Sequence, residues 1–160
     1  MSADNGRLGD FLAFSSVVTG FGVFHLRGTG QVELYLATVD DIVGEEIVGQ
    51  LLDTFCGVMR DAGEDQAAVQ AGLRREILSD AKFGPVARAL IKLWYVGTWY
   101  QLPVEWREPY GQNAMDRTFV VSASSYTEGL LWPAIGANPA GAKAVGYGMW
   151  AMPPLVDMGH

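Results

Sequence analysis

The sequence predicts an all-α protein: a single domain of five to six helices around a central apolar helix at about residues 85–101. The first observation is that nearly every residue between Pro85 and Pro103 is apolar, with only Arg88 and Lys92 charged. The second is that apolar residues elsewhere recur at the three- and four-residue spacing of helices. The third is that only residues 118–121 suggest an extended segment. Together these patterns predict a helical core with little sheet.

The central helix is expected to be a core helix. Pro85 suits a first helical turn, where a missing N–H costs nothing, and Pro103 is expected to stop the helix. A helix that is apolar almost all round either spans a membrane or lies in a protein core. A span needs about 20 predominantly apolar residues, and this stretch is shorter and contains two cations. We therefore predict no direct membrane span.

The other long helices are predicted from their apolar stripes. They cover residues 8–19, a run that begins near residue 31, residues 40–62 with Asp40 as the cap, and residues 64–79. Residues 20–30 are rich in glycine and are expected to form a loop. The stripes that these predictions rest on contain Val48, Leu51, Leu52, Phe55 and Met59 in the third run, and Val69, Leu73 and Ile77 in the fourth.

The chain after the central helix is expected to be less regular. Residues 103–118 contain several turn formers and show no periodicity. Ser125 and Glu128 have the spacing of a capping box, so a short helix is expected to open at Ser125 and to end at Pro133. Residues 1–135 are then the helical domain, and residues 136–160 are an irregular arm of aromatic, glycine and proline residues.

Composition limits the kinds of partner. The chain has 160 residues, 49% of them hydrophobic, and a net charge of −7. Nucleic acids and anionic membranes attract Lys and Arg, so we expect no nucleic-acid partner.

The single cysteine, Cys56, excludes a disulfide within the chain. It lies on the apolar stripe of residues 40–62, where a free cysteine is usually a small buried apolar residue, and its role is left open.

Residues that could carry out catalysis are scarce. A zinc site needs three or four converging His, Cys or carboxylate ligands, and the chain has two histidines, His25 and His160, and one cysteine. Residues 146–151 match G-x-G-x-x-A, but Pro153 and Pro154 follow at once, so no helix can open there to hold a pyrophosphate. We expect no catalytic, cofactor-binding or metal-binding residue. The alternative is a self-contained helical enzyme that uses His25 and nearby carboxylates.

Three stretches resemble the small subunit of membrane-associated, FAD-dependent sugar and polyol dehydrogenases of the sorbitol and fructose dehydrogenase type. They are FLAFSSVVTGF (residues 11–21), LIKLWYVGTWY (90–100) and SYTEGLLWPAIGANPAGAKAVGYGMWAMPP (125–154). The third is the most specific, with its Gly-Ala-Asn-Pro-x-Gly-Ala-Lys core and its closing Trp-x-x-Pro-Pro.

The resemblance implies a non-catalytic, chaperone-like accessory subunit of bacterial oxidoreductase complexes. Such a subunit carries neither flavin nor haem and supports the maturation and stability of its partner. That partner is a large dehydrogenase of the glucose-methanol-choline type, which binds FAD and oxidises sugars, polyols or other alcohols. A cytochrome c subunit is a possible third component. The family is periplasmic or membrane-associated, but Arg7 stands alone where a twin-arginine signal would need a pair, so a cytoplasmic location stays open as well.

The arm is predicted to be the partner-binding segment. Its aromatic and methionine side chains cannot form a core of their own, and such residues are enriched in interface cores. The alternatives are that the arm wraps its own helices, or that the chain is a general helical interaction module with an unrelated partner. The predicted partner-binding residues are Trp132, Asn138, Pro139, Lys143, Tyr147, Trp150, Pro153 and Pro154.

Overall fold

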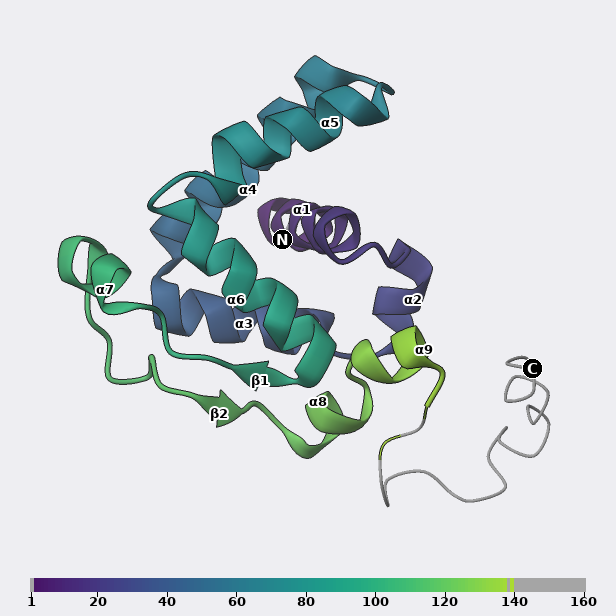
Figure 1. The fold of residues 1–160 in the computed structure, drawn as a ribbon, viewed down its shortest axis with the longest axis vertical. Coiled ribbons are helices and arrows are strands. Elements are labelled where there is room, and N and C mark those ends of the chain that lie inside the picture. Colours follow the sequence, from purple (N-terminus) through teal and green to yellow (C-terminus); the bar gives the residue numbers. More distant parts are fainter. Residues whose placement is uncertain (1, 138, 140–160) are drawn as a thin grey trace.

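The all-α class is confirmed by the computed structural model of the chain, which describes residues 2–137 and 139 (Figure 1). The longer helices are α1 (Ser2–Thr19), α3 (Val32–Val43), α4 (Glu45–Ala62), α5 (Gln66–Leu73) with its π-helical continuation η1 (Arg74–Leu78), and α6 (Phe83–Val96). The shorter helices are α2 (Val23–Gly28), α7 (Val104–Tyr110), α8 (Ala123–Thr127) and α9 (Leu131–Ile135). Strands β1 (Thr98–Trp99) and β2 (Phe119–Val120) form an antiparallel pair.

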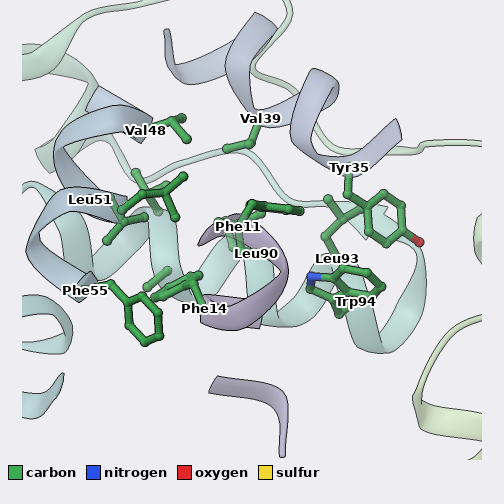
Figure 2. Close-up of a cluster of buried hydrophobic side chains, with 14 of the residues drawn as sticks. Phe11, Phe14, Tyr35, Val39, Val48, Leu51, Phe55, Leu90, Leu93 and Trp94 are labelled. Atoms are coloured by element: carbon green, nitrogen blue, oxygen red, sulfur yellow. The ribbon is translucent and has the colours of Figure 1, made fainter. Parts of the chain in front are cut away.

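One apolar core joins the longer helices. Helix α6 packs against α1, α3 and η1, while α4 packs against α1, α3 and α5. Figure 2 shows side chains from these helices converging in the space between them. The cluster includes Phe11 and Phe14 from α1, Tyr35 and Val39 from α3, Val48, Leu51 and Phe55 from α4, and Leu90, Leu93 and Trp94 from α6.

The predicted apolar stripes point into this core. On α4 the stripe residues Val48, Leu51, Leu52 and Phe55 are buried, and Met59 packs against the core from its edge. On the α5–η1 segment, Val69, Leu73 and Ile77 are buried as well. The spacing of apolar residues therefore identified the correct faces of both helices.

Several predicted helix boundaries in the first half are wrong. Helix α1 begins at Ser2 rather than residue 8, and the expected loop at residues 20–30 contains α2. Asp40 lies inside α3 and caps no helix; the break comes at Gly44, whose φ of 102° suits glycine. The Asp40 carboxylate instead accepts hydrogen bonds from the Arg7 guanidinium, with an Nη2–Oδ1 distance of 2.8 Å.

The central helix is shorter than predicted. It begins at Phe83, two residues before Pro85, and ends at Val96. Gly97 terminates it in the left-handed conformation, with φ 70°, which is the usual geometry of a glycine C-cap. Pro103 is therefore not the stop signal, and the residues between Gly97 and Pro103 are free to form β1.

The second half contains more helix than its sequence suggests. Residues 104–110 form α7, and Trp106 is buried with its Nε1–H donating to the Lys82 carbonyl at 2.8 Å. Ser122, not Ser125, caps α8, because its side chain accepts from the Ser125 N–H at 3.0 Å. Pro133 lies inside α9; this position is in the first turn, where no intrahelical N–H bond is lost.

Among residues 2–137 and 139, no helix has both the length and the apolar character that crossing a bilayer requires.

Candidate partner-docking face

Two short helices carry the most exposed large apolar side chains of the described residues. Phe24 on α2 is 92% exposed and Ile135 on α9 is 61% exposed. Val23 on α2 and Leu131 on α9 are also exposed. Helices α2 and α9 are neighbours in space, because residues of both line one groove (Figure 1), although nearly the whole described chain separates them in sequence. We call the exposed surface of these two helices the α2–α9 face.

Helix α9 is held against the end of α6 by backbone contacts. The Leu130 N–H donates to the Trp94 carbonyl at 2.9 Å, and the Leu130 side chain is fully buried. Gly129 allows the close approach, since a Cβ there would lie 2.6 Å from the Tyr95 carbonyl oxygen. Because these contacts fix the start of α9, the exposure of Ile135 at its other end is set by the fold.

Helix α2 is held in place by one buried side chain and by hydrogen bonds at and after its end. Leu26 is fully buried and anchors it to the core. The Thr29 hydroxyl donates to the Leu26 carbonyl at 2.6 Å and closes the helix. The next residues are tied to α8, because the buried Gln31 accepts from the Ser125 hydroxyl at 2.9 Å. With Leu26 turned inward, the neighbouring Phe24 is left in solvent.

A groove of about 170 Å³ runs between the two helices. It is lined by His25 from α2, by Thr127, Glu128 and Gly129, by Trp132 and Pro133 from α9, and by Ala137 and Pro139. The ring of His25 lies 4.9 Å from that of Phe21. The groove combines apolar walls with one imidazole, one hydroxyl and one carboxylate.

Two of the predicted partner-binding residues lie in this groove. Trp132 is half-buried, with its Nε1–H donating to the Tyr126 carbonyl at 2.9 Å and its ring 5.7 Å from that of Tyr126. Pro139 is buried. The other predicted residues, namely Asn138, Lys143, Tyr147, Trp150, Pro153 and Pro154, lie outside the described residues.

The groove also contains the residues of the enzymatic alternative. His25 is exposed on α2, and it shares the groove lining with the carboxylate residue Glu128, which lies far from it in the sequence. A hydroxyl, from Thr127, completes the polar set. Within the part of the chain that the structure describes, no three His, Cys, Asp or Glu side chains come together as a potential metal site.

Cys56 has the environment of an unreactive thiol. Burial raises its pKa above the usual 9.0, and the negative charge of Asp10 and a hydrogen bond with it raise it further. A thiolate is the nucleophilic form of cysteine, so this environment opposes nucleophilic chemistry. The interpretation of Cys56 as a packing residue agrees with its partly buried contact with the core.

The sequence does not predict the exposure of the two most prominent side chains of the face. Phe24 falls within the glycine-rich stretch that is expected to be a loop, and Ile135 falls within the predicted helical domain. The sequence does contain one signal for Phe24, which lies between two glycine-rich turns. In the structure, Leu26 is the only buried residue of this short helix. No such signal marks Ile135, whose exposure follows from the contact of Leu130 with α6.

No family model, no curated protein and no solved structure matches the chain.

Proposed function

We propose that this chain is the non-catalytic accessory subunit of a large, FAD-dependent dehydrogenase that oxidises sugars, polyols or other alcohols. The observation that carries the proposal is the α2–α9 face. Its two helices carry the most exposed large apolar side chains of the described residues and border the groove at which the C-terminal arm begins. Exposed apolar patches of this kind mark interaction surfaces.

The resemblance supplies the identity of the proposed partner. The most specific of the three resembling stretches, residues 125–154, starts in α8, runs through α9 and continues into the arm. The described part of this stretch, residues 125–137 and 139, thus lies beside the exposed face. In this proposal the face and the arm together bind the large flavoprotein, which holds the FAD, and this chain supplies no reacting group.

Interface energy usually concentrates in a few central aromatic and apolar anchors. On the described side of the proposed interface these are Phe24 and Ile135. Trp132 and Pro139 form the wall of the adjacent groove. Trp132 is half-buried and Pro139 is buried, so in this proposal they hold the two anchors in place. The remaining predicted anchors, Tyr147 and Trp150, belong to the arm.

The test is co-purification from the native host. A tagged chain is expected to bring down a large protein with a flavin absorbance spectrum. The variants Phe24→Ser and Ile135→Ser should each weaken recovery of that protein, since an anchor commonly contributes at least about 2 kcal/mol to binding. The matched control is Val120→Ser on β2, which changes a side chain that is 55% exposed but lies away from the face.

Three outcomes would contradict the proposal. A partner without flavin would favour the general interaction module. Turnover by the isolated chain that is lost in His25→Ala would favour the enzymatic alternative, whose residues share the groove. Equal losses in Phe24→Ser and Val120→Ser would mean that the α2–α9 face is not the docking surface.

A further inference from the structure

The α2–α9 face is next to the point where the arm begins. Pro139, the last described residue, is buried in the groove between the two helices, beside His25 and Trp132. The chain that follows therefore starts at the edge of the exposed face. An extended chain spans at most about 3.3–3.6 Å per residue, so Tyr147 and Trp150 can reach either helix from Pro139.

The arm is chemically suited to cover this face. Residues 140–160 include Val145, Tyr147, Met149, Trp150 and Met152, and their only Lys, Arg, Asp or Glu residues are Lys143 and Asp157. The face offers the complementary apolar surface of Phe24 and Ile135. Tethering raises the effective concentration of a linked segment to the millimolar range when the linker is short and flexible, which favours the chain's own arm over a competing molecule.

We propose that, in the free subunit, residues 140–160 bind the α2–α9 face of their own chain. The contact buries Phe24 and Ile135 against the aromatic and methionine residues of the arm. It protects an apolar surface that would otherwise promote self-association before a partner is met. A partner that uses the same face displaces the arm, so the two contacts are mutually exclusive.

This inference concerns the chain alone and does not depend on the identity of the partner. If the proposed dehydrogenase partner is wrong, the arm still binds the face. If the self-contact is wrong, the arm and face remain available to the dehydrogenase. The experiment below uses purified subunit without any partner, so its result is separate from that of the co-purification test.

The experiment uses photo-crosslinking in the full chain. Phe24 is replaced by p-benzoylphenylalanine, the purified subunit is irradiated at low concentration, and crosslinked peptides are mapped by mass spectrometry. The same replacement at Val120, exposed on β2, is the matched control. We expect crosslinks within one molecule from position 24 to residues 140–160, several-fold more abundant than those from position 120. Trp150→Ala should lower this yield several-fold without changing the helical circular dichroism.

Three results would overturn the inference. Crosslinks that join two molecules would assign the face to a second copy of the chain. Crosslinks from position 24 only to residues outside 140–160 would show that the arm does not cover the face. Equal crosslink yields from positions 24 and 120 would show that the arm does not prefer the α2–α9 face to other exposed surface.

Discussion

The Trp94 indole N–H donates to the Ser15 hydroxyl at 3.0 Å, and both side chains are about 99% buried. This bond joins α6 to α1 at the centre of the core, where the Trp94 ring also lies 4.8 Å from that of Tyr35. A buried polar group without a partner costs about 1–3 kcal/mol. The hydroxyl of Ser15 therefore allows the bulky Trp94 side chain to be buried.

We expect Ser15→Ala to lower the free energy of unfolding by about 1–3 kcal/mol, because it leaves the Trp94 N–H unpaired. Trp94→Ala should cost more, about 3–5 kcal/mol, through the cavity it creates. Urea unfolding measures both. A double-mutant cycle with Trp94→Phe, which removes the donor but keeps a ring, isolates the coupling. If Ser15→Ala costs the same in the Trp94→Phe background as in the natural chain, the bond contributes nothing.

We predict that Gly97→Ala destabilises the chain. Gly97 has φ 70°, and an added Cβ would lie 2.4 Å from the Ser125 carbonyl oxygen. The left-handed conformation alone costs a non-glycine residue about 1–2 kcal/mol, and the clash between α6 and α8 adds to it. Gly49→Ala is the control, since a Cβ at this position of α4 meets nothing within 4 Å. It should stabilise the helix by up to about 1 kcal/mol, so a loss of stability there would contradict the argument.

Stability should fall in alkaline solution through Tyr35. Burial raises the pKa of its phenol above the usual 10.0, although the hydrogen bond with Ser125 opposes the shift. The folded chain therefore keeps a proton that the unfolded chain releases. This contribution is fully present below pH 10.0 and is lost as pH rises through the folded pKa. Urea unfolding as a function of pH measures the slope. Tyr35→Phe should flatten it, and an unchanged slope would assign the effect to other groups.

We expect Cys56 to react slowly with iodoacetamide near neutral pH compared with the chain unfolded in urea, because its pKa is raised. Asp10→Asn removes a charge that raises this pKa and should increase the rate. Arg60 acts in the opposite direction, so Arg60→Gln should decrease it. A change of the same sign in both variants would show that access to the thiol, rather than its charge environment, controls the reaction.

Ending the chain after Pro139 should leave the helical circular dichroism nearly unchanged, because the helices α1–α9 and the apolar core that they form lie within the residues before that position. The melting temperature should fall by only a few degrees, the size expected for a loss of about 1 kcal/mol. Ile135→Ser in the full chain is a useful comparison, since it weakens the same surface without removing the arm. Loss of the helical circular dichroism in the shortened chain would place the arm in the core of the domain.

The sequence predicted the class and the buried faces because both depend on the spacing of apolar residues along one segment. It failed at positions decided by contacts between distant segments. Pro103 looked like the stop signal of α6, but Gly97 ends the helix at the point where Ser125 packs against it. Asp40 looked like a cap, but its carboxylate pairs with Arg7. Ser125 had capping-box spacing, yet its hydroxyl is used by the distant Gln31.

The same distinction between local spacing and contacts of distant segments explains which residues of the candidate site could be predicted. Trp132 and Pro139 could be selected from composition, because aromatic and proline residues cluster in that part of the sequence. Phe24 could not be joined to them, since nothing local in the sequence shows that α2 and α9 meet. The exposure of Ile135 is likewise a result of how Leu130 docks on α6.

The pairing of α2 with α9 also sets an order of events during synthesis. One half of the face, α2, emerges from the ribosome early, and its other half, α9, emerges only after residues 131–135 are made. An exposed Phe24 on a nascent chain has no neighbouring helix to complete the groove. A partner that needs both helices must therefore wait until α9 has docked on α6. Assembly is then expected to follow translation of at least the first 135 residues, and stalled, shorter chains would not be captured.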